Sequence, residues 1–254
     1  MMKKLSLVSL LSMALFTACQ SSTVAKPQEP VVQKESAMIA IPADSRQLIK
    51  VITPDWSAKE GILQRYERSE NGWQKVGKEI NITLGRNGLG WGLGLHTVPK
   101  NAQYIKQEGD GKAPAGLFSL GHGFGYHSLA IEFPYKVYKQ TDHCVDDSNS
   151  KWYNQIIDST QTDRDYKSFE RMKLKSDEYK YGITVNHNPN QVALRGSCIF
   201  IHIRNDKKRG TAGCTAMSED EIIEILEWLD SAKKPLLLQL PKSELHYVLE
   251  SSLR

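Results

Sequence analysis

The sequence predicts a mainly β domain with one α-helix near its C-terminal end. Short apolar or alternating runs recur along the chain, and each is bounded by glycine, asparagine or proline, as strands usually are. Only one segment, residues 218–235, combines a helix start, an apolar helical face and a stop. Glycine-rich loops connect most of the other runs, so we expect strands to dominate the fold.

The N-terminus has the pattern of an export signal. A basic start precedes an apolar run over residues 5–16, and two small residues then lead to Cys19. The run is too short to cross a membrane. Its ending, "LFTAC", resembles the bacterial lipobox, in which the cysteine is acylated and becomes the mature N-terminus. We therefore expect a signal peptide over residues 1–18 and a lipid anchor on Cys19. Gln20 in place of aspartate favours the outer membrane, facing the periplasm.

Two segments follow the anchor. Residues 19–45 are polar and dotted with proline, which is typical of a flexible tether. Residues 46–254 have a globular composition and are numerous enough for one sizeable core. The net charge of +4 is spread over interleaved acidic and basic residues, so we expect no nucleic acid partner.

The first half of the domain consists of predicted strands. Residues 47–53 form one, and residues 62–76 form a hairpin that turns at Asn71-Gly72, a strong turn signal. Residues 79–95 predict a strand that runs into a glycine-rich loop. No GK[ST] follows that loop, so we interpret it as a turn and not as a phosphate-binding loop.

The middle of the domain is less regular. Residues 108–126 predict a loop followed by a short strand, and residues 128–139 predict a strand interrupted at Pro134. A long polar stretch follows over residues 142–181, with a weak helical pattern around residues 167–174.

The last third contains the most regular elements. Residues 181–188 and 197–203 are rich in β-formers, and residues 236–240 predict a final strand. Between them, Ser-Glu-Asp-Glu at residues 218–221 is a capping box that starts the helix. Because the helix begins close behind Cys214, we expect its dipole to favour a thiolate there.

The cysteine count singles out one thiol. With Cys19 acylated, an odd number remains: Cys144, Cys198 and Cys214. In an oxidising compartment this permits one disulfide and one free cysteine. Cys144 and Cys198 look structural, either bridged to each other or buried as two separate thiols. We also expect Cys198 and His202 to share one face of a strand.

Cys214 has three possible roles: core residue, metal ligand or nucleophile. The Thr-Ala-Gly before it is not an apolar run, which disfavours the core. No CxxC or HExxH occurs, and His122 and His127 have no regular ligand spacing, so we expect no metal. A nucleophile needs a base and oxyanion donors. His202 ends the preceding apolar run, and Gly213 allows a turn that aims the amides of residues 213 and 214 at an oxyanion.

The pattern "IHI…GTAGCTAM" resembles the L,D-transpeptidase catalytic domain (YkuD type), in which a strand-borne histidine precedes an S/T-x-G-C turn. In order, "QRYERSENGWQKV", "GRNGLGWG", "EGDGKAPAGLFSLG", "VDD", "YNQIID", "GITVNHN" and "GSCIFIHI" also resemble the larger exported branch of that family. The resemblance implies a β-sandwich-like catalytic domain that acts on peptidoglycan stem peptides. It implies an acyltransferase that needs no metal or organic cofactor.

Carried over, Cys214 matches the nucleophile, His202 the general base, and Thr211 and Gly213 the turn. The chain departs from the family pattern where Ile203, not glycine, follows the histidine, and where the spacing to the cysteine is shorter. Ala212 replaces a second histidine, and Thr215-Ala216 replace an apolar residue and an arginine.

Further residues and two other functions remain open. Asn186, His187 and Asn188 follow a strand and either line the cleft or form a polar turn before Pro189, with Thr211 a fourth candidate for substrate contact. The same Cys–His pair would also serve an L,D-carboxypeptidase or amidase. A non-catalytic lipoprotein that binds the cell wall is the third alternative.

Overall fold

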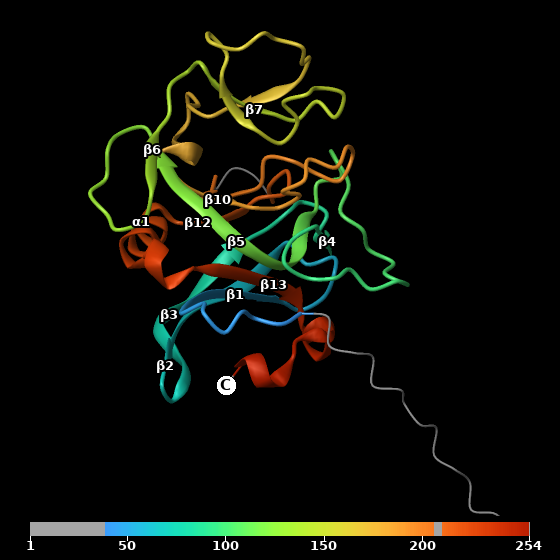
Figure 1. Ribbon diagram of the computed structural model, residues 1–254, viewed down its shortest axis with the longest axis vertical. Helices are drawn as coiled ribbons and strands as arrows, with labels where there is room; N and C mark the ends of the chain where they lie inside the picture. The colour runs from blue at the N-terminus through green and yellow to red at the C-terminus, as the bar shows by residue number, and fades with distance from the viewer. Residues whose placement is uncertain (1–38, 206–209, 254) are drawn as a thin grey trace, which may run out of the picture. The chain divides into compact units, whose positions relative to one another are not determined.

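The computed structural model describes residues 39–205 and 210–253, and it confirms a mainly β fold (Figure 1). The strands are β1 (Gln47–Thr53), β2 (Glu60–Ser69), β3 (Gly72–Thr83), β4 (Leu89–Trp91), β5 (Ala113–Gly125), β6 (Tyr135–Val137), β7 (Asp142–Val145), β8 (Ile156–Asp158), β9 (Phe169–Arg171), β10 (Tyr181–Val185), β11 (Phe200–Ile203), β12 (Thr215–Met217) and β13 (Leu236–Pro241). The helices are α1 (Glu219–Trp228) and the short 3-10 helices η1 (Asp177–Tyr179), η2 (Ser231–Lys233), η3 (Lys242–Tyr247) and η4 (Glu250–Leu253).

The main sheet closes on itself. Its strands pair in the order β10-β11-β12-β3-β2-β1-β13-β5, and β10 pairs with β5 as well, which completes a ring; β4 and β6 attach to β5. In Figure 1, the neighbouring ring strands β1, β13 and β5 cross the middle of the view. Closure leaves the strands of the ring without open edges. Side chains such as Ile49, Leu63 and Leu117, with no exposed surface, fill the core.

Helix α1 packs against the ring beside the predicted site. Ser218 caps it, with the capping box formed as expected: the Ser218 side chain accepts from the Glu221 amide, and the Glu221 carboxylate accepts from the Ser218 amide. Ile222, Ile225 and Leu226, at helical spacing, are fully buried, and the helix contacts β10 and β11.

Of three predicted strand features, one is confirmed and two need correction. The hairpin at Asn71-Gly72 is confirmed, with Gly72 at φ 88°. β5 is 13 residues long, not short, because it pairs with both β13 and β10. Its glycines are required by close packing: a Cβ on Gly123 would lie 2.7 Å from Leu226. The interrupted strand over residues 128–139 is reduced to β6.

A second, three-stranded sheet occupies the long polar stretch, in the order β8-β7-β9. The weak helical pattern over residues 167–174 was a wrong prediction, since this segment contains β9, paired with β7. A disulfide joins Cys144 on β7 to Cys198, with their Cα atoms 6.0 Å apart, and so ties this sheet to the segment before β11. It is the pairing expected from the sequence.

The packed domain begins before residue 46. Ile39 and Ile41 are buried, and Ile39 forms a β-bridge with Val248. Apolar contacts therefore bring into the domain a segment that composition alone assigned to the tether. The expected signal peptide and Cys19 lie outside the described residues. No helix in the described part of the chain combines the length and hydropathy that a membrane span requires.

Candidate active site

Two neighbouring strands bring Cys214 and His202 together. β11 and β12 are parallel, with His202 opposite Ala216. Cys214 precedes Ala216 by two positions, so all three side chains point to the same side of the sheet. Both Cys214 and His202 line one pocket of about 730 Å³. A thiol and an imidazole thus share a cavity large enough for a peptide.

The backbone fixes the tautomer of His202. Its Nδ1 lies 2.8 Å from the carbonyl oxygen of Ile203. A carbonyl oxygen only accepts, so Nδ1 carries the proton and the lone pair of the neutral ring is on Nε2. The ring is buried, and its centre lies 5.3 Å from that of Tyr179, whose plane is nearly perpendicular. The Ile203 carbonyl therefore fixes the orientation of the His202 ring through Nδ1.

Thr211 organises the turn before the cysteine. Its hydroxyl donates to the Cys214 carbonyl at 2.6 Å and accepts from the Gly213 amide at 3.1 Å. The backbone of Thr211 also bonds to Leu84 and Arg86, which anchors the turn to the segment after β3. The sequence predicted that the amides of residues 213 and 214 serve an oxyanion. For residue 213 this was wrong, because its amide already donates a hydrogen bond to the Thr211 hydroxyl.

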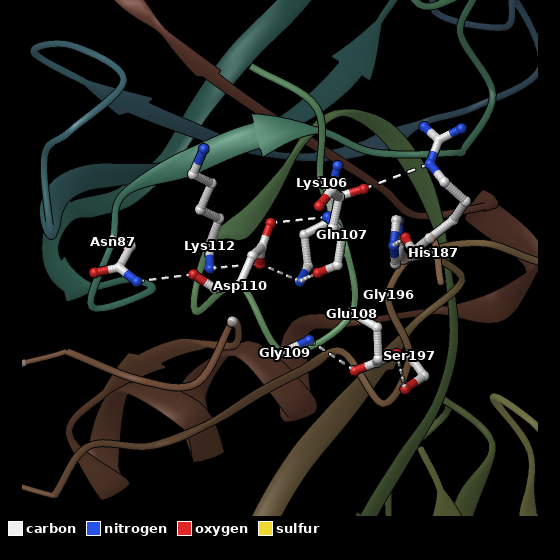
Figure 2. Close-up of polar contacts among 12 residues, drawn as sticks. Asn87, Lys106, Gln107, Glu108, Gly109, Asp110, Lys112, His187, Gly196 and Ser197 are labelled. Carbon is white, nitrogen blue, oxygen red and sulfur yellow. Dashed lines mark hydrogen bonds and ion pairs between the residues drawn. The ribbon is translucent and has the colours of Figure 1, made fainter. Parts of the chain in front are cut away.

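Glycine at position 213 is explained by a close contact. A Cβ there would lie 2.9 Å from the carbonyl oxygen of Lys112. That carbonyl belongs to a loop that Asp110 holds in place (Figure 2). One carboxylate oxygen of Asp110 accepts from the buried Lys106 ammonium at 2.6 Å and from the Lys112 amide at 2.9 Å. The catalytic turn thus packs on a rigid support that sequence reasoning missed.

The Cys214 thiol is buried and protonated at rest. Its sulfur accepts from the Phe200 amide at 3.4 Å and donates to the Cys198 carbonyl at 3.6 Å. Burial, followed by the nearby Glu170 carboxylate, raises the pKa of Cys214. The expectation of a thiolate favoured by the α1 dipole was wrong, because β12 separates the thiol from the first turn of the helix.

Cys198 is not where the sequence placed it. With φ 54° it adopts a left-handed conformation before β11 begins, so the period-two argument that put it on the His202 face fails. The Cys198 backbone amide donates a hydrogen bond to the Asn154 side-chain oxygen at 2.9 Å.

Glu170 and Tyr179 form the part of the pocket wall that sequence analysis missed. The Tyr179 hydroxyl donates to a Glu170 carboxylate oxygen at 2.5 Å, and both residues line the pocket beside Cys214. Burial raises the pKa of Glu170 to about 7, against the opposing effect of the Tyr179 bond. The three-residue strand β9 that carries Glu170 has too few residues to show a periodic pattern.

The remaining predicted contacts lie elsewhere. Asn186, His187 and Asn188 do not line the Cys214 pocket. His187, labelled in Figure 2, is buried. It accepts from the Leu93 amide through Nδ1 and donates through Nε2 to the Arg195 carbonyl at 2.9 Å. Burial lowers its pKa to about 3, so it stays neutral and structural. Asn188 has no exposed surface and braces the same loop, while Asn186 donates to Ser119.

No group of three or more histidine, cysteine, aspartate or glutamate side chains within residues 39–205 and 210–253 is placed to hold a metal ion.

The family model of the YkuD L,D-transpeptidase catalytic domain matches residues 63–237. The chain belongs to the L,D-transpeptidase family. Two crystal structures of the helical cell shape determining protein Pgp2 from Campylobacter jejuni are similar to this L,D-transpeptidase domain. The match to the K307A mutant has 15% identity and a TM-score of 0.45, and it covers 83% of this chain and 52% of the mutant's chain. The other has 16% identity and a TM-score of 0.43, covering 82% and 51%. The chain thus spans about half their length. No curated protein matches.

The structure accounts for the departures from the L,D-transpeptidase pattern. The orienting acceptor for His202 is a main-chain carbonyl, which Ile203 supplies as well as glycine does. Ala212 is exposed at the pocket mouth. Ala216 is buried and paired with Thr83, where a longer side chain would enter the pocket. Three other arginines line the pocket: Arg86, Arg171 and Arg204.

Proposed function

We propose that this chain is a cysteine-dependent peptidoglycan L,D-transpeptidase that acts on tetrapeptide stems through a thioacyl-enzyme. The observation that carries the proposal is the placement of Cys214 and His202 on one side of two adjacent strands, in one pocket, with the His202 lone pair on Nε2. A nucleophile and an oriented base in one cavity are what acyl transfer requires.

The reaction begins with proton transfer from the thiol to His202 Nε2. Because burial keeps the resting thiol neutral, this transfer accompanies attack on the substrate carbonyl. The sulfur bonds to the carbonyl carbon of the diamino acid residue, and the terminal D-alanine leaves with the proton that His202 returns to its amine. An amine acceptor then displaces the sulfur, gives its proton to His202, and restores the thiol.

The arginines that line the pocket favour a substrate that carries carboxylates. Arg86, Arg171 and Arg204 line the pocket together with the thiol. Guanidinium groups match carboxylates in charge and geometry, and a stem peptide carries several carboxylates. These arginines are the groups that we assign to holding the stem while Cys214 attacks.

Mass spectrometry of purified tetrapeptide muropeptides incubated with the protein tests this function. We expect loss of D-alanine and formation of cross-linked dimers, and neither with Cys214→Ala. Tripeptide products without dimers would replace the proposal with an L,D-carboxypeptidase, which uses the same pair with water as acceptor. An unchanged substrate would favour a non-catalytic wall-binding protein.

We further propose that acylated Cys19 anchors the protein in the outer membrane, facing the periplasm, with no nucleic acid partner. The basic start, the apolar run and the lipobox-like ending support this. Incorporation of labelled palmitate that is lost in Cys19→Ala, followed by membrane fractionation, checks it. Unlabelled protein in the soluble fraction would contradict it.

A further inference from the structure

A second pocket, of about 190 Å³, is built mainly from aromatic rings and amides. We call it the aromatic pocket; its principal lining residues are Trp56, Trp91, Asn101, Gln103, Tyr104 and Tyr247. None of these six lines the Cys214 pocket, and nothing in the proposed reaction uses them.

The aromatic rings form a supported platform. Trp56 and Tyr104 stack with their centres 4.9 Å apart and their planes 21° apart. The buried Trp91 supports Trp56 from below at 5.6 Å. Tyr104 nevertheless remains 40% exposed. An exposed aromatic surface that is held rigid and bordered by polar groups is typical of a binding site.

The polar groups around the platform suit a neutral ligand. The exposed side chains of Asn101 and Gln103 make no hydrogen bond to any other described residue. Each amide offers both donors and acceptors. Glu244 at the same pocket accepts from the Trp56 indole at 3.2 Å, and the Lys112 ammonium lies 5.6 Å from the centre of the Tyr104 ring, so the two opposite charges near the platform offset each other. An N-acetylated sugar fits these groups, because its ring has an apolar face for the aromatic rings and its neutral hydroxyl and acetamide groups can bond to the two amides.

One lysine links this pocket to the catalytic turn. The Lys112 ammonium lies 5.6 Å from the centre of the Tyr104 ring. The carbonyl oxygen of the same residue lies 2.9 Å from where a Cβ on Gly213 would be. The two contacts and one fully extended lysine side chain therefore set an upper limit of about 17 Å on the distance between the turn and the ring.

That spacing fits the covalent structure of peptidoglycan. The stem peptide is attached to a sugar, and the scissile carbonyl belongs to its third residue. Three extended residues span about 10 Å, and the lactyl group adds a few ångströms. A stem with its carbonyl at Cys214 is thus long enough for its sugar to reach Tyr104.

We propose that the aromatic pocket binds the glycan strand of peptidoglycan, with a sugar ring packed on the Trp56–Tyr104 platform and its polar substituents bonded to Asn101 and Gln103. This inference rests on the proposed function, because the glycan is assigned from the stem peptide that it carries.

The test compares two substrates, the free tetrapeptide and the same tetrapeptide on its disaccharide. The variants are Tyr104→Ala, the pair Asn101→Ala and Gln103→Ala, and Leu194→Ala as control; Leu194 is 65% exposed and lines neither pocket. We expect Tyr104→Ala to raise KM for the disaccharide substrate about tenfold, to the level of the free peptide, with kcat unchanged. The double variant should also raise KM for the disaccharide substrate, and Leu194→Ala should leave it unchanged.

Direct binding separates the possible failures. A tetramer of N-acetylglucosamine should bind the wild type and the Cys214→Ala variant, and its affinity should fall with Tyr104→Ala. Turnover of both substrates with equal KM, or with no response to Tyr104→Ala, would overturn the glycan site while the proposed function stands. Turnover of neither substrate would overturn the proposed function. If the tetramer also failed to bind, the glycan site in the aromatic pocket would be overturned too.

Discussion

The closed ring and the three-stranded sheet β8-β7-β9 differ in what holds them together. The ring has strands of 3 to 13 residues, a core of fully buried aliphatic residues and no open edges along its closed path. The small sheet has strands of three or four residues, a polar sequence, and a disulfide that ties it to the rest. The ring is stabilised by a large hydrophobic core, and the small sheet by a small buried cluster around Val145 together with the disulfide.

The two regions also divide the chemistry. The ring supplies Cys214 and His202, while the small sheet supplies Glu170, which lies in the same pocket and raises the pKa of the thiol. Reactive groups and their electrostatic surroundings thus come from separate units. Changes in the ring should affect turnover most, and changes in the small sheet should affect stability and pH dependence.

The largest effect is expected at Cys214. Cys214→Ala removes the nucleophile, so turnover should fall by on the order of 10³-fold or more. A carbapenem, which acylates this family, should add to wild type at Cys214 alone, as intact-mass and peptide mass spectrometry would show. The circular dichroism spectrum should stay unchanged. An adduct that persists in the variant would mean that another group is acylated.

His202→Ala should reduce turnover by about 10²- to 10⁴-fold, because the neutral thiol then has no acceptor for its proton. Steady-state kinetics on a tetrapeptide substrate measures this. His187→Ala is the comparison, since His187 lies outside the pocket and acts structurally. Activity close to wild type in His202→Ala would identify a different base.

Loss of the disulfide should weaken the small sheet before the ring. Cys144 and Cys198 are 54 positions apart, and a loop of that length contributes about 4 kcal/mol in the chain-entropy account. Replacing both by alanine should lower the free energy of urea unfolding by about that amount. Hydrogen exchange should accelerate first in β7 and β9. Peptide mapping without reductant that recovers both cysteines as separate alkylated thiols would disprove the bridge.

Glu170→Gln should change the pH dependence of stability. The wild-type carboxyl has a pKa of about 7 when folded, above its ordinary 4.5, so the folded state retains a proton that the unfolded state releases. The free energy of unfolding therefore decreases as pH rises from 4.5 to 7 and levels off above. Because the side chain is partly exposed, we expect a total of about 2 kcal/mol. Urea unfolding of Glu170→Gln should lack this decrease.

Thiol reactivity provides a second readout for the same carboxylate. Without the Glu170 charge, the pKa of Cys214 should fall, and alkylation by iodoacetamide at pH 8 should be faster than in wild type. Tyr179→Phe is the matched control, because it keeps Glu170 but removes the hydrogen bond to it. Equal alkylation rates in wild type and Glu170→Gln would show that burial alone sets the thiol pKa.

The ring was largely predictable from the sequence, and the small sheet was not. Apolar alternation and Asn71-Gly72 defined the hairpin, and the Ser218 capping box defined α1. The short strands of the small sheet lack a detectable period, so Glu170 could not be placed beside Cys214. The sequence also does not specify hydrogen-bond partners. No pattern predicts, for example, that the Gly213 amide donates to the Thr211 hydroxyl.

The contact between His202 Nδ1 and the carbonyl of Ile203 has a consequence for how such proteins are recognised. The proposed base is oriented by a main-chain atom that every amino acid possesses, so the proposed catalysis places no demand on the side chain at position 203. A search pattern that insists on glycine there would reject chains whose catalytic geometry is complete. Patterns built on the strand-borne histidine and the Thr-x-Gly-Cys turn, with the intervening position left free, should recover them.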